Sequence, residues 1–309
     1  VFTVSCAGGV RLDCFLPGTQ EPLEGETGYA VTLSGLLGGH SGMDISKGRA
    51  SANQMMVRTL YSAMECCPGL RLRGIQGGRF DNVICPKNEA LVSVPTQEAG
   101  DFEAFIREFD AILKNEYAGC DDGITLTCGR AEVDSALSRE ATARILRTML
   151  AVPQGVQAMN VDFPGLVQTS LNLGIMGMEA DGLHFSISVR SCIASQKAMM
   201  VQRLRALLEL SGGTMSPRSD YPGWQYARQS ELREDVLAAW QAVSGQEGKI
   251  EATHGGLECG LFIEKIPGLD AVSLGPELHD VHSVKERLSV PSTRRVYELV
   301  LELLKRSNR

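Results

Sequence analysis

The chain has 309 residues, which exceeds the usual size of one domain, so two domains are expected. Its hydrophobic fraction of 43% and charged fraction of 22% are ordinary for a globular protein, and its net charge of −7 argues against a nucleic-acid-binding surface. No apolar run approaches the roughly 18 residues that a membrane span needs, so no membrane partner is predicted.

Nine cysteines are scattered through the chain without regular spacing. Cys66 and Cys67 are adjacent, and no C-x-x-C occurs, so the pattern does not indicate a zinc knuckle. Several cysteines lie in apolar segments, where the side chain behaves as a small hydrophobic group. Reduced thiols in a cytoplasmic protein are therefore favoured over disulfides.

Two strands are predicted at the start of the chain, over residues 1–8 and 10–16. The stretch 31–64 then predicts a strand, a glycine-rich loop and a helix whose cap is Asp44 or Ser46. The loop has glycines at positions 35, 38, 39 and 42. His40 lies among them, with few neighbouring side chains to bury it, which favours contact with a polar or anionic ligand. The alternative is a tight turn with an exposed histidine.

Two sets of helices and strands follow. The first has strands at 70–75 and 82–94, a helix at 100–117 and a strand at 124–133. The second has a helix at 138–150, strands at 166–175 and 182–190, and a helix at 194–211. This succession predicts an α+β domain, an antiparallel sheet with helices on one face.

Residues 214–224 are rich in Pro, Ser and Gly and are interpreted as a connector and domain boundary. Beyond them, helices at 229–245 and 291–306 alternate with strands KIEATH and DAVSLG, ending at residues 254 and 275. Alternation of this kind predicts a parallel, helix-covered α/β sheet, with sites at the strand ends.

Several polar residues are candidates for a site. Arg190 ends an alternating strand, and its guanidinium suits bidentate capture of a carboxylate; an exposed arginine is the alternative. Asn82 can hydrogen-bond a peptide carbonyl, although asparagine in a turn is more common. His282 lies in a loop after a strand, where neutral imidazole could bind zinc, but a polar surface loop is the simpler interpretation.

The segment HGGLECG at 254–260 joins a strand to a helix. The amides of Gly255 and Gly256 could approach a substrate carboxylate at the helix N-terminus, with Glu258 in the same segment. A tight strand-to-helix turn is an equal alternative. A nucleophilic pair of Cys259 with His254 is disfavoured, because the local pattern supplies no orienting group.

Three segments carry a family resemblance: GLLGGHSGMDISKGRASANQMM at 35–56, RFDNVICPKNEA at 79–90, and HGGLECGLFIEKIPGLDAVSLGPELHDVHSVKERLSV at 254–290. They resemble, in order, segments of the bacterial aminoacyl-histidine dipeptidases, also called Xaa-His or cytosolic non-specific dipeptidases. This family belongs to the clan of dinuclear-zinc exopeptidases and deacylases, whose catalytic domain carries an inserted lid.

The resemblance implies a function and a division of the chain. Residues 1–8 would be a remnant of the mixed α/β catalytic domain, 9–213 an α+β lid that also dimerises, and 214–309 the end of the catalytic domain. The implied substrate is a dipeptide such as Xaa-His, cleaved by a zinc-activated water in a cytoplasmic homodimer. The implied cofactor is two zinc ions.

The resemblance also implies residue roles. His282 falls on the last zinc ligand. His40 would stabilise the oxyanion, in the partner's site if the lid crosses the dimer, while Asn82 and Arg190 would reach over the substrate. Gly255, Gly256 and Glu258 fall in the segment that would contact the substrate.

Other motifs of the family are missing. None of the five histidines is followed two positions later by Asp, and Glu-Glu does not occur. We therefore expect the chain to be the C-terminal portion of a longer dipeptidase, binding no metal tightly and hydrolysing nothing by itself. The alternatives are a deacylase or carboxypeptidase of the same clan, and a lid-type dimerisation module without catalysis.

Overall fold

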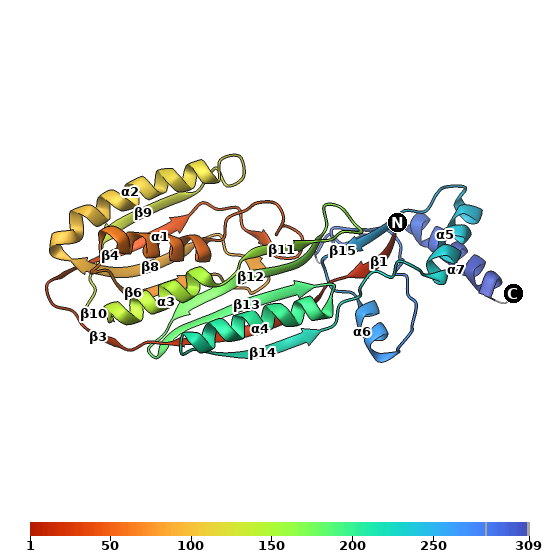
Figure 1. Ribbon diagram of the computed structural model, residues 1–309. Coiled ribbons are helices and arrows are strands. Elements are labelled where there is room, and N and C mark those ends of the chain that lie inside the picture. The colour runs from red at the N-terminus through yellow and green to blue at the C-terminus, as the bar shows by residue number, and fades with distance from the viewer. Residues whose placement is uncertain (282, 308–309) are drawn as a thin grey trace.

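A computed structural model describes residues 1–281 and 283–307 (Figure 1). The molecule is elongated, with a broad sheet covered by helices at one end and a smaller part that holds both chain termini at the other. We call residues 8–221 the sheet region, and residues 1–6 with 224–307 the terminal region.

The sheet region is built on a nine-stranded sheet in which all the neighbouring strands are antiparallel. Eight strands follow the order β14-β2-β13-β12-β6-β8-β4-β9, and β11 pairs with β12. The strands are β2 (Gly8–Pro17), β4 (Glu26–Ser34), β6 (Arg71–Gly77), β8 (Asn88–Pro95), β9 (Thr125–Arg130), β11 (Gly155–Met159), β12 (Val167–Met178), β13 (Gly182–Ser191) and β14 (Thr214–Tyr221).

Four helices cover one face of this sheet (Figure 1). They are α1 (Ala52–Cys66), α2 (Ala99–Glu116), α3 (Arg139–Ala151) and α4 (Ala194–Leu210). Each buries one apolar stripe: in α2, for example, Phe102, Ile106 and Phe109 recur at helical spacing and are buried. These stripes and the inward strand residues form one large core, which confirms the predicted α+β architecture.

The sheet region consists of two halves with the same topology. The first half runs in chain order β4-α1-β6-β8-α2-β9, and the second β2-α3-β12-β13-α4-β14. In each half the fourth strand is outermost, followed by the first, third and second. The halves meet where β6 pairs with β12, through Gly77 opposite Met176 and Gln76 opposite Gly177. The two predicted sets of helices and strands therefore form two similar halves of one sheet.

The terminal region contains less regular structure. β1 (Phe2–Cys6) pairs in parallel with β15 (Ile250–Thr253). Around them lie α5 (Glu231–Ser244), α6 (Glu258–Lys265), α7 (Val290–Ser307) and the short pair β16 (Leu278–His279) and β17 (Arg287–Leu288). Its core consists of Phe2, Val236, Ala239 and Leu299 with partly buried neighbours. No helix among the described residues is long and apolar enough to cross a membrane.

The structure differs from the sequence expectations in several places. Residues 270–275, expected to form a strand of a parallel sheet, contribute only an isolated antiparallel bridge between Ser273 and Thr3. Residues 214–221, expected in a connector, form β14 at the edge of the sheet, where Pro217 is tolerated because an edge strand has unpaired backbone groups. Helix α1 begins at Ala52 after Ser51, beyond Asp44 and Ser46. Asp44 is instead used inside the glycine loop, as described below. The boundary between the two predicted domains stays a prediction.

Candidate active site

His40 lies on β5 (Gly39–His40), which pairs with β7 (Val83–Ile84). The loop that carries it is closed at its base by Asp121, a fully buried residue. One carboxylate oxygen of Asp121 accepts from the N–H of Leu37 at 2.6 Å, and the other from the N–H of Ala50 at 2.7 Å. Gly38 and Gly39, the two residues before His40, have positive φ, which explains why both positions are glycine.

Local hydrogen bonds fix the orientation of His40. Its main-chain N–H donates to Oδ2 of Asp44 at 2.8 Å, and the Gly42 N–H donates to its Nδ1 at 3.1 Å. A neutral ring that accepts at Nδ1 carries its proton on Nε2, which can then donate to a ligand. Burial, followed by the positive charge of Arg190, lowers the pKa of His40 below its ordinary value. His40 is thus a neutral donor near neutral pH.

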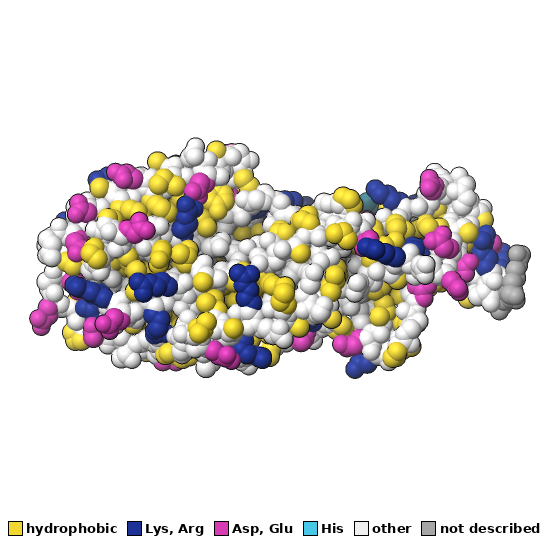
Figure 2. Space-filling model, in the orientation of Figure 1, with side chains coloured by type: hydrophobic (Ala, Val, Ile, Leu, Met, Phe, Trp, Pro, Cys, Tyr) yellow, Lys and Arg dark blue, Asp and Glu magenta, His cyan; other side chains and the backbone are white. Residues whose placement is uncertain are grey.

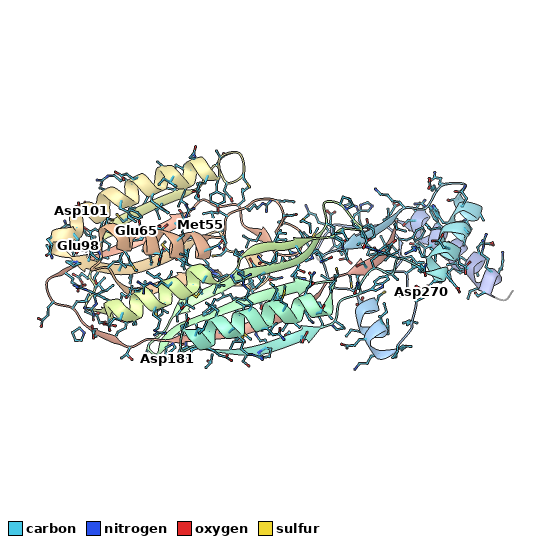
Figure 3. The ribbon with its side chains drawn as sticks, viewed as in Figure 1. Met55, Glu65, Glu98, Asp101, Asp181 and Asp270 are labelled. Carbon is cyan, nitrogen blue, oxygen red and sulfur yellow. The ribbon has the colours of Figure 1, made fainter. Side chains whose placement is uncertain are left out.

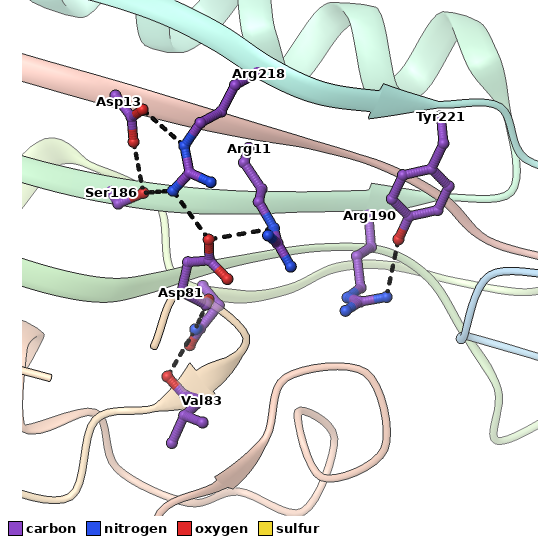
Figure 4. Close-up of polar contacts among 9 residues, drawn as sticks. Arg11, Asp13, Asp81, Val83, Ser186, Arg190, Arg218 and Tyr221 are labelled. Carbon is purple, nitrogen blue, oxygen red and sulfur yellow. Dashed lines mark hydrogen bonds and ion pairs between the residues drawn. The ribbon is translucent and has the colours of Figure 1, made fainter. Parts of the chain in front are cut away.

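Arg190 lies near the end of β13, opposite Gly9 of β2 and Ser170 of β12. Gly9 is needed here, because a Cβ at this position would lie 2.6 Å from Oη of Tyr221. Tyr221 therefore lies over β2, where its hydroxyl accepts from Nη1 of Arg190 at 3.2 Å (Figure 4). Arg190 is only 9% exposed, and among the described residues its buried Nε has no hydrogen-bond partner. A buried cation with an unused donor suits an anionic ligand.

His254 of the terminal region contacts the strand that lies next to Arg190. It is 4% exposed, and its Nε2 forms a 2.8 Å hydrogen bond with Oγ of Ser170. Burial, reinforced by the charge of Arg190, lowers the pKa of His254 to about 4. A Cβ on Gly42 of the His40 loop would lie 3.5 Å from the His254 carbonyl oxygen. The sheet region and the terminal region therefore meet at His40, Arg190 and His254 within one chain.

Asn82 lies in the turn before β7, next to the His40 loop. Its carbonyl oxygen accepts from the N–H of Ser41 at 2.9 Å. The turn is held by Asn172 of β12, whose Nδ2 donates to the carbonyls of Asp81 at 2.8 Å and Val83 at 2.9 Å. Asn82 is half-buried and directly precedes Val83, the residue that pairs with His40 between β5 and β7.

The glycines after His254 mainly shape the turn. The Gly255 N–H donates to Oγ1 of Thr253 at 3.1 Å, so this amide is already bonded. Gly256 is exposed and close to the Tyr221 ring. Glu258 is exposed at the first residue of α6, and burial raises the pKa of the Cys259 thiol. A nucleophilic Cys259–His254 pair is therefore unsupported.

Among the described residues, no group of three metal-binding side chains lies beside His40. His282 lies outside the described residues. Among residues 1–281 and 283–307, one trio of metal-binding side chains is close enough to hold an ion: Glu179, Asp181 and His184, at the turn between β12 and β13. Asp181 marks this turn in Figure 3, at the end of β12 and β13 that points away from the terminal region. Asp181 is nine residues before Arg190, about 30 Å along the strand. The described residues thus do not hold zinc beside His40.

Three site residues escaped prediction: His254 as a site residue, Ser170 and Tyr221. Ser170 is 84 residues from His254, and Tyr221 is 31 residues from Arg190, so only strand pairing brings them together. The single available signal was the histidine before two glycines at 254–256.

Comparisons with known proteins support the family resemblance. Residues 31–120 match the family model of the peptidase dimerisation domain. The cytosol non-specific dipeptidase of Escherichia coli (strain K12) is 33% identical over 305 residues, 98% of this chain and 62% of that protein. The crystal structure of aminoacylhistidine dipeptidase from Vibrio alginolyticus superposes with a TM-score of 0.92 at 28% identity, covering 98% of this chain and 62% of that one.

The chain therefore spans about three fifths of the length of both relatives. The match to the dimerisation domain falls on the first half of the sheet region, from β4 to the loop after α2. Residues 31–120 thus resemble a peptidase dimerisation domain, and the chain, as its motifs predict, resembles the aminoacyl-histidine dipeptidases over nearly its whole length.

Proposed function

We propose that the chain supplies the peptide-binding half of a dipeptidase that acts on short peptides such as Xaa-His. The observation that carries this proposal is the buried Arg190 guanidinium, which has an unused Nε donor among the described residues. A planar guanidinium binds a carboxylate through two parallel hydrogen bonds. Arg190 would therefore anchor the C-terminal carboxylate of the peptide, with Tyr221 holding the guanidinium in place.

His40 has the second role in this proposal. Its Nε2–H is available, and the nearby positive charge of Arg190 helps to keep the ring neutral. A donor held beside the carboxylate anchor could bond the oxygen of the scissile carbonyl, where negative charge develops during hydrolysis. Asn82, in the paired turn, would bond the same peptide backbone. Because the charge of Arg190 acts on His40 of the same chain, the proposed site uses both residues of one chain.

Peptidases of this kind generally use metal ions, and we infer two zinc ions for the whole enzyme, with His282 as one ligand. Among the described residues, no group of three zinc-binding side chains lies beside His40. We expect this chain to bind zinc weakly, as equilibrium dialysis would measure. A His184→Ala variant would remove the contribution of the exposed Glu179–Asp181–His184 trio.

We further propose that Gly255, Gly256 and Glu258 border the peptide site, and that the protein is a cytoplasmic homodimer. The free state of all nine cysteines and the name of the Escherichia coli relative support a cytoplasmic location. The dimerisation domain supports the homodimer, with the outer strands β9 and β14 offering exposed edges. Light scattering at micromolar concentration without metal would detect such a dimer.

Binding of two matched peptides tests the function. Calorimetry with glycyl-histidine and with glycyl-histidinamide, which lacks the carboxylate, is expected to show at least a tenfold weaker affinity for the amide, because Arg190 loses its anion. Arg190→Gln should abolish this preference. The control Arg203→Gln changes an exposed arginine of α4 and should leave both affinities unchanged. Equal binding of the two peptides by the unaltered chain would contradict the proposal.

A further inference from the structure

Asp81 links the two halves of the sheet region. It lies in the turn between β6 and β7, on the first half, and its side chain is only 9% exposed. Its Oδ2 pairs with Nε of Arg11 at 3.2 Å and with Nη2 of Arg218 at 3.1 Å (Figure 4). Both arginines belong to the second half, on β2 and β14, where they face each other in register. One carboxylate oxygen of the first half is therefore bound by two cations of the second.

The arginines are on the sheet face that carries the carboxylate anchor. Arg11 is opposite Ser188 of β13, and Arg190 is two residues farther along that strand. Side chains two residues apart on a strand point to the same face. Figure 4 shows Arg11, Arg218 and Arg190 on neighbouring strands, with the Asp81 turn beside them. Asp81 is thus bound to the same strands that position Arg190.

The Asp81 turn also positions the residues proposed to contact the peptide. Asn82 follows Asp81 directly, and its carbonyl accepts from the N–H of Ser41, next to His40. Val83 pairs with His40 in the β5–β7 ladder. A continuous set of contacts therefore leads from the arginines of the second half, through Asp81 and Asn82, to His40.

The backbone of this turn fits closely against the second half. A Cβ on Gly174 of β12 would lie 2.6 Å from Cα of Asp81, and a Cβ on Gly78 would lie 1.8 Å from the Gly174 carbonyl oxygen. Asn172 holds the carbonyls on either side of Asn82. The turn thus has a neutral backbone attachment to β12 and a separate charged attachment through the Asp81 side chain. The charged attachment can be removed while the backbone attachment stays.

We propose that Asp81 is a positioning residue: its ion pairs with Arg11 and Arg218 set the placement of His40 and Asn82 relative to Arg190. The inference rests on the proposed function, because it assigns these residues to one peptide site. It adds that the site depends on a charge contact between the halves, formed by a residue that does not touch the peptide. Breaking that contact should change peptide affinity and the surroundings of His40 together.

Asp81→Asn is the decisive variant, because it removes the charge but keeps the size of the side chain. Calorimetry should show glycyl-histidine binding at least tenfold weaker. Nuclear magnetic resonance of labelled histidine should show the His40 pKa rising toward its ordinary value, since His40 becomes more hydrated and lies farther from Arg190; Asp44, the other charged group near it, is unchanged. Asp81→Glu should give intermediate values.

Asp13→Asn is the matched control. Asp13 pairs with Nε of the same Arg218 at 2.7 Å and accepts from Oγ of Ser186 at 3.0 Å, so its partners all lie on strands of the second half. This variant should leave the affinity within twofold and the His40 pKa unchanged. An Asp81→Asn chain that folds with both quantities unaltered, or equal changes in the two variants, would overturn the inference.

Two further measurements separate the possible failures. If the unaltered chain does not bind glycyl-histidine, the proposed function fails, and the His40 pKa comparison still decides the role of Asp81. If Asp81→Asn does not fold, Arg11→Gln replaces it, because Arg11 is 38% exposed and its loss leaves the Arg218 pair in place. Arg11→Gln should weaken binding about threefold and raise the His40 pKa, and no change in either would count against the inference.

Discussion

The sheet region and the terminal region differ in how much apolar surface they bury. The sheet region has one core that runs beneath all four helices and includes fully buried Tyr29, Phe102 and Leu72. The core cluster of the terminal region has only four buried residues, and this region exposes many large apolar side chains, some of which are visible in Figure 2. Exposed examples are Leu261, Phe262 and Ile266 near α6, and Val290, Tyr297 and Leu304 on α7. The sheet region therefore has the core of an independent domain, whereas the terminal region has little core of its own.

This difference predicts that substitutions in the two regions change stability unequally. The sheet region contains the large core and also His40, Asn82 and Arg190. The terminal region contributes His254, which bonds Ser170 of the sheet region. Substitutions in the first should change the free energy of unfolding strongly. Similar substitutions on the exposed apolar surface of the second should change it little.

The largest expected effect comes from comparing two phenylalanines. Phe102 is fully buried in α2, and Phe102→Ala should lower the free energy of unfolding by about 3–5 kcal/mol, since it removes apolar contacts and leaves a cavity. Phe262 is 57% exposed in α6, and Phe262→Ala should change it by less than about 0.5 kcal/mol. Urea unfolding measures both values, and similar losses would mean that the two regions share one core.

A smaller effect is expected from the buried histidine that joins the regions. The pKa of His254 is about 4 in the folded chain against an ordinary value of 6.5, so the unfolded chain binds more protons between these values. His254 therefore contributes stability above pH 6.5 that is lost as the pH falls toward 4. The loss is about 3 kcal/mol, at about 1.4 kcal/mol for each pH unit of pKa difference.

Urea unfolding at several pH values tests this contribution. His254→Gln should flatten the pH dependence between 4 and 6.5, because glutamine does not titrate. The exposed His279→Gln variant provides the control and should retain the slope of the unaltered chain. A slope that His254→Gln does not change would show that other groups cause the acid sensitivity.

The smallest expected effect compares two helix caps. Ser138 accepts from the N–H of Ala141 at the start of α3 in the sheet region, and Ser230 accepts from the N–H of Arg233 at the start of α5 in the terminal region. Ser138→Ala should cost about 1 kcal/mol of unfolding free energy. Ser230→Ala should cost somewhat more locally, because Ser230 also donates to Asp270.

Amide hydrogen exchange distinguishes the effects of the two serine substitutions. The Ser230→Ala loss should be confined to amides of the terminal region, whereas the Ser138→Ala loss should extend through the sheet region. Exchange that rises throughout the chain in both variants would remove the distinction between the regions.

Sequence reasoning identified the local features because they depend on neighbouring residues. The stripe of Phe102, Ile106 and Phe109 predicted α2, and the glycines around His40 predicted an irregular loop. It placed the start of α1 too early, because Asp44, a good helix cap, bonds the His40 main chain and pairs with Lys47 instead. Whether Asp44 caps a helix or bonds the loop depends on where the loop is anchored. Here Asp121 anchors it by bonding the N–H groups of Leu37 and Ala50.

By itself the sequence determined the helices, most strands, the α+β class and the glycine loop that carries His40, because periodicity and glycine placement act over a few residues. Only the tertiary structure decided that Ser170 and His254 meet across 84 residues, that Tyr221 binds Arg190, and that Asp81 joins the two halves. The register of distant strands sets these contacts, and it depends on how the whole core packs rather than on any local pattern.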